Sequence, residues 1–142
     1  MNKIKFSRLL IFLPFLMGFQ CGEEIFSEDD LLLENGFSGS WEISEESING
    51  SSDLLPKCCK YFNFYLDGNP NDLVGEYTYS EDNSGNIDGV FIVDPTKQEL
   101  IFQGKDGTDI LASYSMNAEQ NYLILSYKAG RTELVQGWTR VD

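Results

Sequence analysis

Turn-forming residues recur along most of this chain, and no other feature constrains its fold as strongly. Beyond Gly36 they come about every 10 to 15 residues, and the runs between them are short and rich in β-branched, aromatic and aliphatic side chains. The turn clusters stand at 67–72, 81–88, 94–95, 105–107, 117–121 and 129–130. No helical period of useful length interrupts them. This spacing is typical of an all-β sandwich or barrel.

The runs between the turns predict roughly eight strands, at 40–46, 59–66, 73–80, 87–93, 98–104, 109–116, 121–128 and 132–141. Several runs alternate, so that Phe62, Phe64 and Leu66 share one face, as do Tyr77 and Tyr79 on the next strand. Alternation of this kind indicates antiparallel strands with one buried face. Short turns favour a meander, and eight strands can close into an up-and-down barrel without sheet edges.

The N-terminus has the features of a targeting segment. Lys3, Lys5 and Arg8 precede a continuous apolar run at 9–19, which is about half the length that a membrane-spanning helix needs. We therefore predict that residues 1–20 are a secretory signal peptide rather than part of the fold. An uncleaved membrane anchor is the alternative.

The apolar run ends at Met17-Gly18-Phe19-Gln20-Cys21, which resembles a lipobox, the bacterial signal that places a diacylglycerol on cysteine. Gly18 and Gln20 depart from it, because the pattern prefers Leu and a small residue at those places. The resemblance implies a lipoprotein, lipid-anchored through Cys21 to the outer membrane and periplasmic or surface-exposed. Two acyl chains on one residue give stable anchoring.

Residues 21–36 are predicted to be an acidic tether with a single helical turn. Ser27 and the acidic residues after it are an acceptable helix start, the turn would pack Leu31 to Leu33 on the domain, and Asn35-Gly36 is a good stop. Glu23 and Glu24 either resemble a signal for export to the outer face of the cell or simply solvate the tether. Residues 37–142 then form one domain.

Charge narrows the range of partners. Without residues 1–20 the chain keeps 7 of its 10 basic residues against 23 acidic ones, a net charge of −16. Nucleic-acid binding needs a basic surface, so it is excluded as a function class. Contact with anionic lipid is expected only through the covalent anchor. We expect a monomer.

The order of features resembles the lipocalin superfamily, and more closely the small bacterial lipocalin-like lipoprotein domains. Gly39-Ser40-Trp41 matches the G-x-W that opens their first strand. A long connection at 47–58, an aromatic second strand and a closing Gly137-Trp138-Thr139-Arg140 run follow. The resemblance implies an eight-stranded barrel in which Trp41 plugs the closed end and Arg140 packs across it. Other signatures of the superfamily are missing, and no helix follows the last strand.

The residues that most enzymes depend on are scarce. The chain has no histidine, which removes the commonest general base and the usual zinc and copper sites. No glycine-rich phosphate loop is present, and no pair of carboxylates stands out. We predict neither an enzyme nor a cofactor.

Two constellations could carry inorganic chemistry, and each has a simpler explanation. Cys58-Cys59 could form a vicinal disulfide, stay as two thiols, or contribute to a soft-metal site that would need further ligands. Oxygen donors alternate at 82–88 and 67–71, but neither series has the glutamate that completes a calcium loop. Polar hairpin turns explain both series, so no metal site is predicted.

The function that these features favour is a membrane-anchored binding domain for a small hydrophobic ligand. Its predicted interior lining consists of Phe62, Phe64, Leu66, Tyr77 and Tyr79. The alternative is a structural or interaction lipoprotein of the cell envelope. In that case side chains would fill the barrel, and Tyr61 and Tyr65 on the outer face would meet a protein partner.

Overall fold

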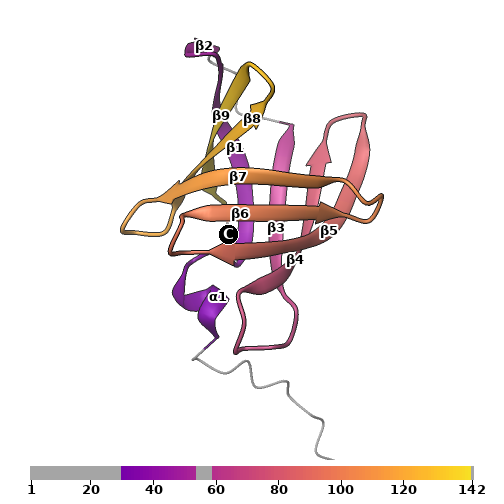
Figure 1. Cartoon of the computed structure of the whole chain (residues 1–142), viewed down its shortest axis with the longest axis vertical. Helices are drawn as coiled ribbons and strands as arrows, with labels where there is room; N and C mark the ends of the chain where they lie inside the picture. Colours follow the sequence, from indigo (N-terminus) through magenta and orange to yellow (C-terminus); the bar gives the residue numbers. More distant parts are fainter. Residues whose placement is uncertain (1–29, 54–58, 142) are drawn as a thin grey trace, which may run out of the picture.

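One short helix and nine strands make up the part of the chain that the computed structural model describes, residues 30–53 and 59–141 (Figure 1). The helix is α1 (Leu31–Glu34). The strands are β1 (Gly39–Ile48), β2 (Ser51–Asp53), β3 (Lys60–Leu66), β4 (Val74–Glu81), β5 (Gly85–Asp94), β6 (Glu99–Gly104), β7 (Asp109–Met116), β8 (Tyr122–Ala129) and β9 (Thr132–Arg140).

The strands form an antiparallel barrel. Each strand from β3 to β9 pairs with the next one along the chain, β1 pairs with β3, and β1 also pairs with β9 over the registers Trp41↔Arg140 to Ile48↔Leu134. The last pairing closes the sheet on itself and leaves β2 as an extra strand beside β1. The predicted fold class, an eight-stranded up-and-down barrel after one helical turn, is confirmed.

The prediction was wrong at the connection after the first strand. That strand was expected to end at residue 46 and to be followed by a loop at 47–58, but β1 runs on to Ile48 and turns back into β2. The turn is Asn49-Gly50, with φ of 51° and 80°. Two residues of positive φ suit a two-residue hairpin turn, for which Asn-Gly is a preferred pair. Leu54 and Leu55 lie outside the described residues.

The helical turn is set by its caps. The Asp30 carboxylate accepts a hydrogen bond from the Leu32 backbone N–H at 2.9 Å, so Asp30 is the N-cap. Ser27, the expected start, lies outside the described residues. Asn35 is the C-cap, and Gly36 follows with a φ of 74°, a conformation that glycine adopts without strain.

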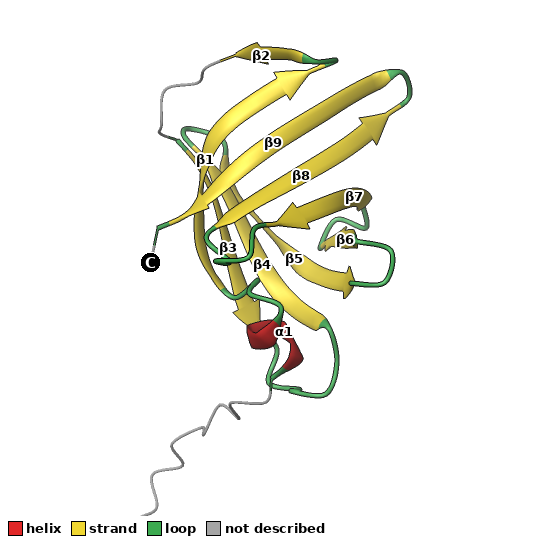
Figure 2. Ribbon diagram, turned by 90° about the vertical axis from the view of Figure 1, so that its left-hand side faces the viewer, coloured by secondary structure: helices red, strands yellow, loops and turns green. Residues whose placement is uncertain are grey.

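Inward side chains of the strands form one apolar core. Figure 2 shows α1 at one end of the barrel and β2 at the other. Leu32 from the helix and Phe37 after it are fully buried in the same cluster as Trp41, Phe64 and Trp138. The helix end of the barrel is therefore closed by the segment that precedes β1.

Candidate functional site

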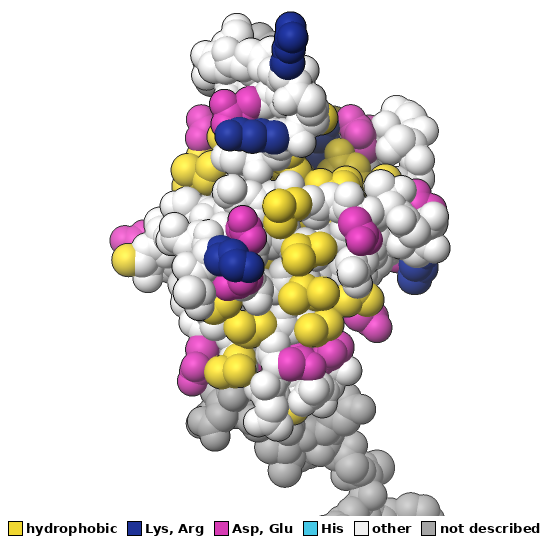
Figure 3. All heavy atoms as spheres, in the orientation of Figure 1, with side chains coloured by type: hydrophobic (Ala, Val, Ile, Leu, Met, Phe, Trp, Pro, Cys, Tyr) yellow, Lys and Arg dark blue, Asp and Glu magenta, His cyan; other side chains and the backbone are white. Residues whose placement is uncertain are grey.

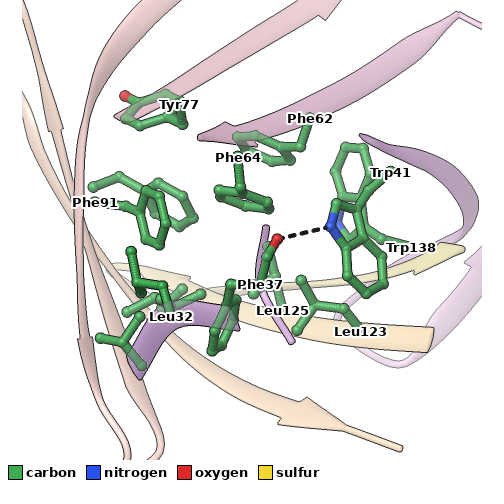
Figure 4. Packing of buried hydrophobic residues seen from close by; sticks show 14 of the residues in the cluster. Leu32, Phe37, Trp41, Phe62, Phe64, Tyr77, Phe91, Leu123, Leu125 and Trp138 are labelled. Atoms are coloured by element: carbon green, nitrogen blue, oxygen red, sulfur yellow. Dashed lines mark hydrogen bonds between the residues drawn. The ribbon is translucent and has the colours of Figure 1, made fainter. Parts of the chain in front are cut away.

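The closed end of the barrel is built around Trp41. Its side chain is fully buried, and its indole N–H donates a hydrogen bond to the Phe37 carbonyl oxygen at 3.1 Å (Figure 4, dashed line). The guanidinium carbon of Arg140 stands 4.6 Å from the centre of the Trp41 ring, within the range of a cation–π contact. Trp41 thus meets the segment before β1 on one side and the last residue of β9 on another.

Arg140 connects three segments through its guanidinium group. It donates hydrogen bonds to the carbonyl oxygens of Gln120 at 2.9 Å, Ser38 at 2.6 Å and Gly36. Gln120 in turn donates from its side-chain amide to the Glu34 carbonyl at 2.8 Å. Arg140 therefore ties the end of α1 and the β7–β8 turn to the last strand.

Side chains fill the interior next to this closed end. Phe37 makes an edge contact with Phe64 at 6.4 Å between ring centres, and Phe64 makes another with Phe91 at 4.9 Å (Figure 4). Tyr114 packs edge-on against Phe37 at 5.0 Å. Gly75 on β4 allows this density, because a Cβ there would overlap the Phe91 ring at 2.5 Å. This half of the barrel is packed as a core.

The opposite end of the interior holds a cavity of about 550 Å³. Its walls come from inward positions of β3, β4, β6, β8 and β9, from the open ends of β5 and β7, and from the exposed Lys128 near the end of β8. The lining residues are Phe62, Tyr77, Tyr79, Ile87, Phe102, Asp109, Ile110, Leu111, Tyr127, Lys128, Ala129, Leu134 and Gln136. Most of them are apolar or aromatic, as expected of a small-molecule site.

The mouth of this cavity extends between β7 and β8. The two strands pair only from Ala112↔Tyr127 to Met116↔Leu123, so the first three residues of β7, at 109–111, have no partner on β8. The cavity lining includes those three residues of β7 together with Lys128 and Ala129 of β8. Ile110 and Leu111 are about half exposed there. A ligand could enter through this gap as well as through the end of the barrel.

Three phenols face the cavity, Tyr77 and Tyr79 from β4 and Tyr127 from β8. Burial raises the pKa of Tyr127, and the nearby hydroxyls of Tyr79 and Tyr77 raise it further. Burial also raises the pKa of Tyr79, followed by the effect of the Glu81 carboxylate, to which the Tyr79 hydroxyl donates at 3.1 Å. These phenols therefore stay neutral at physiological pH and can donate hydrogen bonds.

Charged groups at the rim of the barrel pair with one another. Lys60 lies between two carboxylates, 3.2 Å from Glu46 and 3.7 Å from Glu81. Gln136 donates to the same Glu46 carboxylate at 2.6 Å. Glu46 can meet Gln136 because an irregularity between Ile43 and Glu45 shifts the register of β1 against β9.

One buried donor beneath the cavity has no partner. Trp138 is fully buried, and its indole N–H forms no hydrogen bond with any described residue. Its ring contacts Phe62 at 4.8 Å and Tyr79 at 6.5 Å between ring centres, and both of these side chains line the cavity. Buried polar groups are normally paired, so this N–H needs an explanation.

The structure divides the predicted interior lining in two. Phe62, Tyr77 and Tyr79 line the cavity, whereas Phe64 is buried in the packed half and Leu66 packs against that core. Sequence reasoning missed cavity residues that come from later strands: Ile87, Phe102, Ile110, Tyr127, Leu134 and Gln136. The alternation in β8 and β9 carried the signal for the last three of these, since odd positions of β8 and even positions of β9 face inward.

The outer wall carries a second hollow, a groove of about 450 Å³ over β4, β5 and β6. Tyr77 lines both the groove and the cavity. It does so because Gly89 has no side chain, and a Cβ there would lie 2.7 Å from the Tyr77 ring. Tyr77 thus forms part of the barrel wall between the two hollows.

The outer face also exposes apolar side chains, which gather in the middle of the view in Figure 3. The exposed large hydrophobic residues include Val90 on β5 and Leu111 on β7. Tyr61 and Tyr65, the residues predicted to meet a protein partner, face outward on β3 and are 36% and 50% exposed. The Tyr61 hydroxyl donates to Glu42 at 3.2 Å.

The cysteines are only partly described. Cys59 is in a disulfide, but Cys21 and Cys58 lie outside the described residues, so the vicinal pairing and the lipid anchor both stay predictions. Residues 1–20, the predicted signal peptide, lie outside them as well.

The two oxygen-rich segments behave as turns. Asp67 accepts a hydrogen bond from the Asn69 backbone N–H at 2.8 Å, and the Ser84 backbone N–H donates to the Glu81 carbonyl oxygen at 3.1 Å in the β4–β5 turn. Asp88 lies on β5 and accepts from the Thr78 hydroxyl on β4 at 2.9 Å. Among the described residues no cluster of three or more acidic or cysteine side chains is placed to hold a metal ion. In the same part of the chain, no helix has the length and apolar character needed to cross a bilayer.

Fold and cavity together define a class: closed antiparallel β-barrels that are plugged at one end and hollow at the other. No protein-family model matches the chain, and no curated protein matches it. Among solved structures it is similar to a designed protein described as "De novo design of a fluorescence-activating beta barrel". The TM-score is 0.50 at 12% identity, and the match covers 78% of this chain and 99% of the designed one. At that identity the likeness shows the fold alone.

Proposed function

We propose that this protein is a membrane-anchored lipoprotein with a lipocalin-like barrel that binds a small hydrophobic ligand. The observation that carries the proposal is the cavity at the open end. Its volume of about 550 Å³ lies within the range of small-molecule sites, about 300–1,000 Å³. Phe62, Tyr79 and Phe102 give it the aromatic walls on which an apolar molecule would pack.

The arrangement of the barrel supports a binding role over a purely structural one. Side chains fill the half near Trp41 and leave the other half hollow, although small barrels can be filled by their own side chains. The similar designed barrel is described as fluorescence-activating.

The lipid anchor is proposed from the leader and from Cys21. The described chain begins at Asp30 beside α1, at the closed end of the barrel. Nine residues lead from Cys21 to Asp30, and they can span at most about 30 Å. An anchored barrel would then hold its closed end near the membrane and its cavity mouth away from it. The ligand would come from the aqueous side.

Binding can be tested with the uncharged fluorescent probe N-phenyl-1-naphthylamine. We expect saturable fluorescence enhancement with the wild-type chain. Leu134→Trp, which fills the cavity from β9, should weaken it at least about tenfold, since lost space removes the contacts that hold an apolar probe. Glu133→Trp is the matched control, because Glu133 is exposed on the opposite face of the same strand. Equal binding by both variants would place the probe elsewhere.

Anchoring can be tested by fractionation of cells that express the chain. We expect wild type in the membrane fraction and Cys21→Ser in the soluble fraction. The mass of the N-terminal peptide should show acyl chains on Cys21. A Cys21→Ser protein that stays on membranes would remove the anchoring half of the proposal and leave the binding half intact.

A further inference from the structure

Two donors, one beside the cavity and one inside it, have no acceptor in the described part of the protein. The indole N–H of Trp138 is buried without a partner, and an indole can donate a hydrogen bond but cannot accept one. A buried donor without an acceptor costs about 1–3 kcal/mol. The Trp138 N–H, whose ring contacts those of Phe62 and Tyr79, is therefore a donor that lacks an acceptor.

Tyr127 adds a second donor inside the cavity. It faces inward on β8 beside the buried Leu125, and its hydroxyl makes no hydrogen bond within residues 30–53 and 59–141. Because burial holds its pKa above the ordinary value, the phenol keeps its proton. Tyr79 differs, since its hydroxyl already donates a hydrogen bond to Glu81.

The charges around the cavity disfavour an ionic ligand. Lys60, which could pair with an anion, already lies between Glu46 and Glu81. Lys128 is exposed at the mouth, where an ion pair is worth little. The chain as a whole is strongly acidic, which repels anions. Asp109 is the carboxylate among the lining residues, and it is exposed at the mouth, where an ion pair with a cationic ligand is worth little.

The walls favour a flat molecule. Phe62 stacks on Phe102 with 5.4 Å between ring centres and 20° between planes, and Tyr79 tilts against Phe62 at 5.1 Å. Aromatic rings make offset or edge contacts of this kind with one another. A planar ring system could add to the same cluster with little rearrangement.

We propose that the ligand is an uncharged, planar aromatic molecule that carries a hydrogen-bond acceptor such as a carbonyl oxygen. The ring system lies against Phe62, Tyr79 and Phe102, and the acceptor receives a hydrogen bond from Tyr127 or from Trp138. This inference rests on the proposed function and names the chemistry of its ligand.

The test compares three probes of similar size by isothermal titration calorimetry on the full chain: 2-acetylnaphthalene, 2-ethylnaphthalene and 2-naphthoate. We expect the ketone to bind about three to ten times more tightly than the hydrocarbon, the gain typical of one hydrogen bond, and more tightly than the anion. Equal affinities, or tightest binding of 2-naphthoate, would overturn the inference and leave the proposed function standing. If none of the three binds, both fail.

Two variants locate the donor. Tyr127→Phe and Trp138→Phe each remove one donor and keep an aromatic ring, so at least one of them should bring the ratio of ketone to hydrocarbon affinity close to one. Tyr114→Phe is the control, because Tyr114 packs on Phe37 in the filled half of the barrel. If the ratio survives in both variants, or falls equally in the control, the assignment of the acceptor to this cavity is wrong.

Discussion

Replacement of Arg140 by Met should destabilise the barrel by about 3 kcal/mol. The side chain donates to the carbonyl oxygens of Gln120, Ser38 and Gly36 and lies over the Trp41 ring. Hydrogen bonds to a charged group contribute about 1.5–3 kcal/mol each. Arg140 and Ser38 are partly exposed, so water replaces part of the lost hydrogen bonding. We therefore count about a third to a half of the summed contribution of the three hydrogen bonds. Met keeps much of the apolar stem.

The loss can be measured by urea unfolding followed by tryptophan fluorescence. With a denaturant dependence of about 1.5 kcal/mol per molar, the midpoint should fall by about 2 M. Arg140→Lys should recover only part of the lost stability, because an ammonium group cannot reach all three carbonyl oxygens that the planar guanidinium group contacts. Arg131→Met, at the exposed β8–β9 turn, is the control. A midpoint for Arg140→Met within about 0.3 M of that control would refute the reasoning.

Three further predictions concern the wall, the cavity and the cap. Tyr127 has a raised pKa in the folded state. Its contribution to the free energy of unfolding is therefore complete below about pH 10 and is lost above that pH, by up to about 1.4 kcal/mol per pH unit. Tyr127→Phe should flatten the alkaline limb of the curve of stability against pH. Gly89→Ala should cost about 1–3 kcal/mol in urea unfolding, since its Cβ would overlap the Gln103 carbonyl oxygen. Asp30→Ala, which removes the acceptor for the Leu32 N–H, should cost about 1 kcal/mol by the same assay. An unchanged stability–pH curve for Tyr127→Phe, or an unchanged urea midpoint for Gly89→Ala or Asp30→Ala, would contradict the corresponding prediction.

The strand pattern was predictable because it depends on local sequence. Phe62, Phe64 and Leu66 alternate with polar or exposed residues, and the structure turns all three inward on β3. The turns at 81–88 and 105–107 end their strands through local hydrogen bonds and positive φ angles, which neighbouring residues decide. The β1–β2 hairpin was missed because its strand, Ser51–Asp53, is short and polar and shows no alternation.

The cavity could not be predicted in the same way, because it depends on which strand ends diverge. Inward residues such as Phe64 and Tyr79 look alike in the sequence, yet one is in the packed half and the other lines the cavity. The difference arises from α1 and Phe37, which fill one end, and from the early end of β7–β8 pairing at Ala112, which opens the other.

The sequence by itself determined the period of the strands, the places of most turns and the acidic charge, because each depends on residues close together along the chain. Only the tertiary structure decided the register in which β9 returns to β1, the carbonyl oxygens that Arg140 reaches beside Trp41, and the meeting of the Tyr77, Tyr79 and Tyr127 phenols in one hollow. Those contacts join residues up to about a hundred positions apart, and their geometry depends on the closure of the whole sheet.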